Sequence, residues 1–129
     1  PFSQYSKNIK ALKKLDYDII IIDTPPYLTD ILTKLFEVSD YVLVPSKVSY
    51  VDIMAVRATI DMINDVRRSH TQLKAGLVLN MVKSSSSINA EIKELIKSLD
   101  IALLTASVCD RVSVTRSLTL DGIFNTDDL

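Results

Sequence analysis

An aspartate at the tip of an apolar segment is the residue of this chain best placed for chemistry. Residues 17–26 read YDIIIIDTPP, so that four isoleucines precede Asp23. An apolar run without alternation predicts a central strand of a parallel sheet, covered on both faces. Thr24, Pro25 and Pro26 would end that strand, because proline has no N–H to donate to a neighbouring strand. Open α/β sheets bind ligands at the carboxyl ends of their strands, where Asp23 would lie. A strand that ends in a capping aspartate before a turn fits the same residues.

Asn80 stands at the end of another apolar segment. Residues 74–81 read KAGLVLNM and predict a strand that places Asn80 at its carboxyl end. A side-chain amide carries both hydrogen-bond donors and an acceptor, which suits a planar ligand whose edge also presents a donor and an acceptor. An asparagine that merely ends a strand at a turn is an equally good interpretation of this residue alone.

The elements that must position these residues alternate between strands and helices. Short apolar runs predict strands over residues 17–23, 41–45, 74–81 and 102–106, and the last of these contains Thr105. Apolar residues at helical spacing predict helices over residues 3–15, 30–38, 51–68, 88–99 and 110–120. This order predicts an α/β fold with a mainly parallel sheet and flanking helices, in a single domain over residues 1–129.

Composition excludes several classes of protein. The chain has 129 residues, of which 47% are hydrophobic, and its 15 basic and 16 acidic residues give a net charge of −1. Such a balance does not indicate nucleic-acid or membrane binding by bulk charge. The single cysteine cannot form an internal disulfide, and no apolar run is long enough to span a bilayer. We therefore expect a cytoplasmic protein that does not contact membranes.

The chain lacks a glycine-rich phosphate-binding loop. It contains two glycines, Gly76 and Gly122, whereas such a loop needs glycines clustered between a strand and a helix. The sequence also begins at Pro1 rather than at a methionine. Taken with the family resemblance described below, these two observations predict that the chain is the carboxyl-terminal part of a longer protein.

Four features resemble the ParA/MinD group of deviant Walker ATPases, in that family's order. They are the apolar strand ending in DTPP, the segment VSDYVLVPSKVSYVDIMAV with its proline-ended strand, Asn80, and the tail from Leu103 to Leu129. The resemblance covers nearly the whole chain from about Ile9 onward. It implies a partial P-loop NTPase-like fold and, for the complete protein, a partition ATPase that segregates plasmid or chromosomal DNA.

The resemblance also implies roles for individual residues. Asp23 would reach the Mg²⁺ of bound ATP through water, which makes it the catalytic and metal-associated residue, while Thr24 and Pro25 belong to the loop that senses the γ-phosphate. Asn80 would hydrogen-bond the adenine edge, and Thr105 lies in the last strand, before a loop near the base. The basic residues Lys83, Arg111 and Arg116 are candidates for holding DNA phosphates. Met81 departs from the family pattern, in which arginine often follows the asparagine.

Partners follow from the same resemblance. The complete protein would form a homodimer when it binds ATP, coat DNA non-specifically, and respond to a centromere-binding ParB-like protein. Without the phosphate-binding loop, we expect the 129-residue chain alone neither to bind ATP tightly nor to hydrolyse it.

Three alternatives remain at the level of the sequence. Bacterial tyrosine kinases of the same superfamily share DTPP, but they usually end in a tyrosine cluster that this tail lacks. A response-regulator receiver also has a strand-end aspartate, but it needs an acidic pair after its first strand, and only Asp16 and Asp18 precede Asp23. A non-enzymatic module that keeps the fold and binds a partner is the third.

Overall fold

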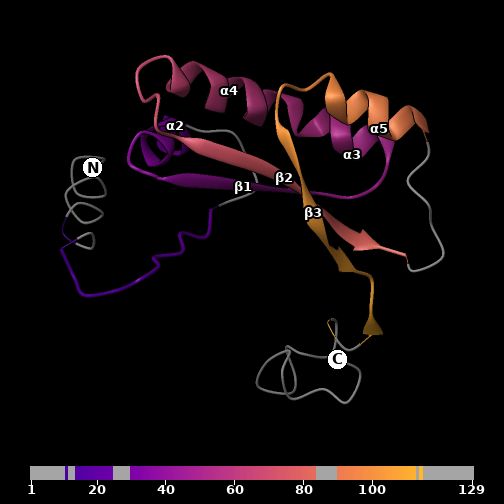
Figure 1. Ribbon diagram of the computed structural model, residues 1–129, viewed down its shortest axis with the longest axis horizontal. Coiled ribbons are helices and arrows are strands. Elements are labelled where there is room, and N and C mark those ends of the chain that lie inside the picture. Colours follow the sequence, from indigo (N-terminus) through magenta and orange to yellow (C-terminus); the bar gives the residue numbers. More distant parts are fainter. Residues whose placement is uncertain (1–10, 12–13, 25–29, 84–89, 113, 115–129) are drawn as a thin grey trace. The chain divides into compact units, whose positions relative to one another are not determined.

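The computed structural model describes residues 11, 14–24, 30–83, 90–112 and 114 (Figure 1). The chain divides into two compact units. The first combines residues 1–42 with residues 57–75, and the second combines residues 43–56 with residues 76–129. None of the helices in the described ranges has the length and apolar character needed to cross a lipid bilayer.

A three-stranded parallel sheet runs through the described residues and confirms the predicted α/β class. Its strands are β1 (Tyr41–Ser46), β2 (Lys74–Val82) and β3 (Ala102–Cys109), in the order β1-β2-β3. Each corresponds to an apolar run that predicted a strand, and β3 continues three residues further than expected. β-Branched and leucine residues dominate the centres of β1 and β2, where Val44, Leu77 and Leu79 are buried.

The first unit is built around two helices that pack against each other. They are α2 (Asp30–Phe36) and α4 (Arg57–Arg67), and apolar residues on one face of each are buried. These residues are Leu32, Leu35 and Phe36 on α2, and Ile60, Ile63 and Val66 on α4. Polar contacts fix the ends of the helices. His70 Nε2 lies 3.1 Å from the carbonyl oxygen of Ser39, and Arg67 Nε donates to the carbonyl oxygen of Leu73 at 3.1 Å.

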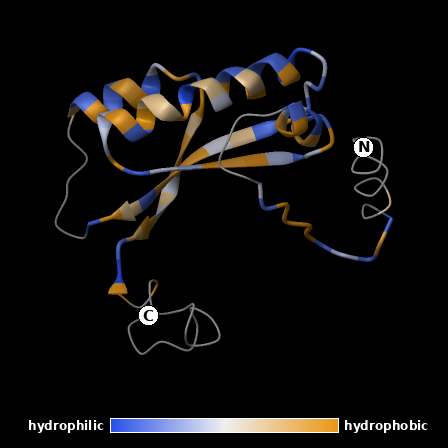
Figure 2. Cartoon of the chain, turned by 180° about the vertical axis from the view of Figure 1, so that it is seen from behind, coloured by the Kyte–Doolittle hydropathy of each residue, from blue (hydrophilic) through white to orange (hydrophobic). Residues whose placement is uncertain are grey.

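The second unit packs two helices beside the parallel strands. They are α3 (Tyr50–Ala55) and α5 (Ala90–Lys97), which contact each other, and α5 also contacts β3. Ile53 of α3 and Ile96 of α5 are almost completely buried, together with Leu77 of β2. Apolar and polar residues alternate along α5, as the colours of Figure 2 show, because one face packs on the core and the other meets solvent.

The prediction of one long helix over residues 51–68 is wrong. The segment forms two helices, α3 and α4, separated at Val56. Val56 has φ −79° and ψ −8°, and its N–H still donates to the carbonyl oxygen of Asp52 at 3.3 Å. No proline or glycine stands at the break, so the sequence carries no local stop signal. The break coincides with the boundary between the two compact units.

The prediction of a buried central strand over residues 17–23 is also wrong. No described strand pairs with this segment, and its isoleucines are exposed. Ile19 and Ile21 are 78% and 88% exposed, whereas Ile20 and Ile22 are 38% and 37% exposed. This alternation is typical of extended backbone, in which successive side chains point to opposite sides. A strand also needs a neighbour for its N–H and C=O groups, and these residues lack one within the described chain.

Two predicted helices fall largely outside the described residues. The described residues of the predicted helix over 3–15 are Ala11, Lys14 and Leu15, and Ala11 is helical. In the predicted helix over 110–120, Val112 and Val114 are helical, and the N–H of Val114 donates to the carbonyl oxygen of Arg111 at 3.1 Å. The serines at 84–87 and Gly122 also lie outside the described residues.

Candidate functional site

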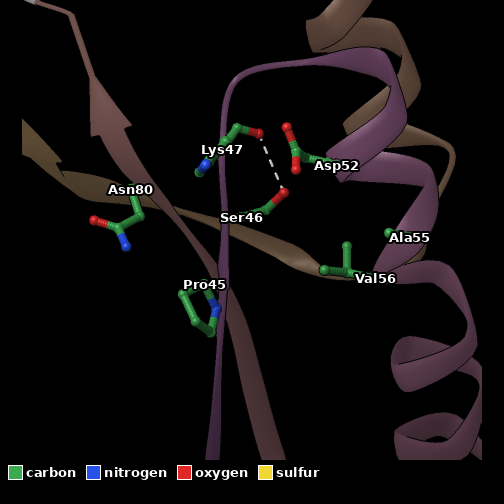
Figure 3. Close-up of a pocket in the computed structure, with 7 residues that line it drawn as sticks. All are labelled: Pro45, Ser46, Lys47, Asp52, Ala55, Val56 and Asn80. Carbon is green, nitrogen blue, oxygen red and sulfur yellow. Dashed lines mark hydrogen bonds between the residues drawn. The ribbon is translucent and has the colours of Figure 1, made fainter. Parts of the chain in front are cut away.

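The carboxyl ends of β1 and β2 line a shallow cavity of about 290 Å³ in the second unit (Figure 3). Residues from β1 and the loop after it, from α3 and its end, and from β2 surround this space. They are Pro45, Ser46, Lys47, Asp52, Ala55, Val56 and Asn80. The cavity therefore lies at the sheet edge where parallel α/β proteins bind their ligands.

The β1 side of the cavity is shaped by a proline and a buried serine. Pro45 supplies no N–H to a neighbouring strand, which is tolerated because β1 is an edge strand of the described sheet. Ser46 is 5% exposed, and its hydroxyl donates to the carbonyl oxygen of Lys47 at 3.1 Å. This bond satisfies a buried polar group and tightens the chain as it leaves the strand.

Ser49 then begins α3 and places Asp52 beside the cavity. Ser49 has extended backbone angles and is the N-cap residue, and its hydroxyl oxygen accepts the backbone N–H of Asp52 at 3.1 Å. The same hydroxyl donates to the Asp52 carboxylate. A serine three residues before an acidic residue is a reciprocal capping arrangement, which also puts negative charge at the positive end of the helix. The Asp52 side chain is thereby held in place.

A distortion of β2 holds Asn80. The pairing with β3 runs Gly76 to Ala102 and Leu77 to Leu103, and the register then shifts before Leu79 pairs with Ser107 and again before Val82 pairs with Cys109. The second shift gives β2 an extra residue around Asn80 and Met81, which is a β-bulge. Met81 has φ 55°, a left-handed conformation uncommon for any residue but glycine. Bulges of this kind redirect side chains, and here Asn80 lines the cavity.

The cavity carries one positive and one negative side chain. Lys47 is exposed, whereas Asp52 is half-buried and its carboxylate already accepts a hydrogen bond from the Ser49 hydroxyl. Figure 3 shows Asp52, Ala55 and Val56 on one side of β1 and Asn80 on the other. The arrangement suits a small polar ligand that meets a cation, an amide and a carboxylate from different elements.

The residues predicted for the site are divided between the two units. Asp23 and Thr24 follow the isoleucine segment in the first unit and are exposed. Asn80 and Thr105 belong to the second unit, where Thr105 is exposed on β3 and does not line the cavity. Pro25 lies outside the described residues. Among the residues that the structure describes, no group of three His, Cys, Asp or Glu side chains could hold a metal ion.

Two of the three predicted basic residues stand where adjacent strands end. Lys83 follows β2 and Arg111 follows β3 closely, and both are exposed and engaged in interactions. The backbone N–H of Asp110 donates to the carbonyl oxygen of Val82 at 2.9 Å, which joins the two strand exits. The third, Arg116, lies outside the described residues.

Sequence reasoning did not assign Ser46, Lys47 or Asp52 to a site. The rule that identified Asn80, a polar residue at the carboxyl end of a parallel strand, applies equally to Ser46 at the end of β1. Lys47 and Asp52 carried a weaker signal, because their contribution depends on the loop that leads into α3.

Comparison with known proteins decides the family. The AAA domain family matches residues 3–77, which is more than half of the chain. This chain belongs to the AAA domain family. Its relatives place it with the ParA/MinD-type ATPases, which confirms the resemblance drawn from DTPP, the proline-ended strand, Asn80 and the tail.

Three relatives are similar to this AAA domain over most of its length. The maintenance of carboxysome distribution protein A of Halothiobacillus neapolitanus is 31% identical over 125 residues, which are 95% of this chain and 57% of that protein. Protein IncC of Escherichia coli is 28% identical over 88% of this chain and 32% of its own length. A ParA family protein of Mycoplasma pneumoniae is 23% identical over 74% of this chain and 35% of its own length. The chain therefore spans between about a third and somewhat more than half of these relatives.

Proposed function

We propose that this chain forms part of a ParA-like partition ATPase that uses the binding and hydrolysis of Mg-ATP to segregate plasmid or chromosomal DNA. The observation that carries the proposal is the cavity at the carboxyl ends of β1 and β2, into which the bulge of β2 directs Asn80. Membership of a family of partition and positioning ATPases supports the same function.

Five residues would contribute to the nucleotide site. Asp23 would orient Mg²⁺ through water, and Thr24 and Pro25 would form the loop next to the γ-phosphate. The metal supplies positive charge that neutralises the transferred phosphoryl group. Asn80 would contact the base from the end of β2. Thr105, the fifth residue proposed for the nucleotide, would lie in the strand before the loop near the base.

The carboxylate proposal is tested by replacing Asp23 in the protein expressed from its natural coding sequence. Asp23→Asn should lower ATP hydrolysis at least about tenfold, because a neutral amide does not orient the metal as a carboxylate does. Asp61→Asn is the matched control, since Asp61 is an exposed aspartate on α4. Hydrolysis that is equal in the two variants would contradict the role of Asp23.

The proposed DNA contacts have their own test. In the ATP-bound homodimer, Lys83, Arg111 and Arg116 would hold DNA phosphates without reading sequence. Replacing Lys83 and Arg111 together by alanine should weaken DNA binding and reduce the slope of log affinity against log salt by about 1 for each lost phosphate contact. Lys93→Ala, an exposed lysine on α5, is the control. An unchanged slope in the double variant would exclude these residues from the DNA interface.

The 129-residue chain by itself should neither hydrolyse ATP nor bind it tightly, because it has no glycine-rich loop to surround the phosphates. A malachite-green assay on the isolated chain would detect released phosphate. Turnover above the buffer blank would refute this expectation. If the protein from the natural coding sequence also failed to bind ATP, a non-enzymatic partner-binding module would be favoured.

A second candidate function concerns the cargo. The relative with the widest coverage of this chain among the three is named for the maintenance of carboxysome distribution. By that similarity, the cargo would be a protein compartment rather than a plasmid or chromosome. Deleting the gene distinguishes the two candidate cargoes. Loss of plasmid or chromosome inheritance in the deletion strain would support DNA as the cargo and a ParB-like partner. Clustered compartments in that strain would support the compartment as the cargo and an adaptor on its surface.

A further inference from the structure

Lys47 is the first residue after β1, and its backbone is held at the edge of the cavity. Pro45 has a restricted φ, and the buried hydroxyl of Ser46 donates to the carbonyl oxygen of Lys47 at 3.1 Å. This hydrogen bond uses only the backbone of residue 47, so it does not depend on the lysine side chain. The side chain therefore begins at a defined point at the carboxyl end of the strand, where it lines the cavity.

The ammonium group of Lys47 has no acidic partner in the described part of the chain. On α5, the exposed side chain of Lys97 pairs with Glu94 of the same helix at 2.7 Å. Lys47 follows an extended strand, and no ion pair joins it to Asp52 or to any other acidic residue that the structure describes. The Asp52 carboxylate accepts the hydroxyl of Ser49 instead. The cavity thus contains a positive charge that no described residue neutralises.

This charge suits an anionic ligand group. An ammonium group has three hydrogen-bond donors and no acceptor, and it binds phosphate as a compact point charge. Asp52 is the acidic residue that lines the cavity, and it lies on the other side of β1 from Asn80 (Figure 3). A ligand that contacts Asn80 consequently lies away from the side chain that would repel a phosphate.

The size of the cavity limits the distance between the two contacts. Its volume is about 290 Å³. Sites for small molecules and cofactors usually occupy about 300–1,000 Å³, so this cavity is near the lower end of the range. Lys47 and Asn80 both line it, and they would therefore contact neighbouring parts of one ligand. In a nucleotide, the anionic group closest to the base is the phosphate attached to the ribose.

We propose that Lys47 binds the phosphate group attached to the ribose of the bound nucleotide. The proposal rests on the nucleotide-binding function proposed above, with the base at Asn80. This phosphate is common to AMP, ADP and ATP, so Lys47 contributes equally to the binding of all three. It keeps its bonds when the terminal phosphoryl group is transferred, so Lys47 stabilises the substrate and the transition state to the same extent.

The test uses the protein expressed from its natural coding sequence and a set of ligands that differ by one phosphate each. Adenosine, AMP, ADP and ATP compete with a fluorescent ATP, and the competition gives a dissociation constant for each. The variants are Lys47→Gln, which removes the charge, and Lys47→Arg, which keeps it. Lys74→Gln is the matched control, because Lys74 is an exposed lysine at the start of β2, whereas the cavity lies where β2 ends. Thermal unfolding of each variant checks that it folds.

The expected result is a constant factor. Lys47→Gln weakens the binding of AMP, ADP and ATP by the same factor of about 10, the effect of one lost charge-assisted hydrogen bond, and leaves adenosine within about twofold. Lys47→Arg and Lys74→Gln retain the affinity for all four ligands within about threefold. The unaltered protein binds AMP about 10-fold more tightly than adenosine. In ATP hydrolysis, Lys47→Gln raises KM and leaves kcat within about twofold.

Other results overturn the proposal or its basis. A loss confined to ATP would assign Lys47 to the terminal phosphate, and a loss that extends to adenosine would show that the change acts on the nucleoside or on the shape of the cavity. An unaltered protein that binds AMP no more tightly than adenosine would exclude the contact without any variant. If the unaltered protein does not bind the fluorescent ATP, the proposed function itself fails, and this inference fails with it.

Discussion

Asp100 occupies a backbone conformation that glycine would adopt at lower cost. It is the third residue after α5, with φ 49°, and it is exposed. The turn that leads to it is closed by hydrogen bonds from the N–H groups of Ser98 and Leu99 to the last carbonyl oxygens of the helix. Left-handed residues are common at this position, where glycine is preferred because it has no Cβ. Asp100 also places a negative charge near the negative end of the helix.

We expect Asp100→Gly to raise the free energy of unfolding by about 1 kcal/mol. Relief of the left-handed conformation contributes about 1–2 kcal/mol. Removal of the charge adds about 0.3 kcal/mol. The greater freedom of glycine in the unfolded chain opposes these by about 0.4–1 kcal/mol. Asp100→Asn should gain only the charge contribution, whereas Asp100→Val should lose about 1–2 kcal/mol, because a β-branched residue is poorly accommodated at positive φ.

Urea denaturation followed by circular dichroism measures the series, and the order of the midpoints should be Gly, Asn, Asp, Val, from most to least stable. Asp61→Asn removes the same charge from an exposed position within α4 and controls for net charge. A glycine variant no more stable than the unaltered protein, or a valine variant as stable as the asparagine one, would refute the role assigned to the backbone at Asp100.

Three further changes test the packing, the capping and the exposed segment. Leu77→Ala should lower the free energy of unfolding by about 2–5 kcal/mol, because Leu77 of β2 is 0% exposed and the shorter side chain leaves a cavity in the core. Urea titration measures this change. A loss below about 1 kcal/mol would contradict the burial of Leu77. Ser49→Ala should cost about 1 kcal/mol in the same assay, since the N–H of Asp52 loses its cap, while Ser49→Thr should retain most of the stability. Ile21→Lys should change the free energy of unfolding of the 129-residue chain by less than about 0.5 kcal/mol, because Ile21 is 88% exposed. A loss of several kcal/mol would instead favour the buried strand that the sequence predicts.

Much of the fold could be predicted because it is encoded locally. The strands β1, β2 and β3 follow short apolar runs bounded by polar residues, and α5 follows a regular spacing of isoleucine and leucine. In α5 the period of the apolar residues and the side that becomes buried agree, so that Ile92 and Ile96 are both in the core, whereas β3 forms although none of its residues is buried. Local pattern and tertiary packing then give the same answer.

The failures arise where a neighbour decides the structure. The run of isoleucines at residues 19–22 has the composition of a buried strand, but a strand exists only when another strand satisfies its backbone groups. The break at Val56 has no residue signal at all and coincides with the boundary between two compact units. The spacing of apolar residues identifies the buried face of a single helix or strand. It carries no information about which segments contact one another.

The candidate site shows the same division between local and non-local information. A polar residue at the carboxyl end of a parallel strand can be identified from sequence, and Asn80 is such a residue. The bulge that turns Asn80 toward the cavity depends on the register between β2 and β3, which no single segment specifies. The backbone N–H of Met81 donates to the side-chain oxygen of Asn80, and this hydrogen bond follows from the same bulge. The identity of the residue is thus readable from the sequence, whereas the position of its side chain is set by the pairing of two strands.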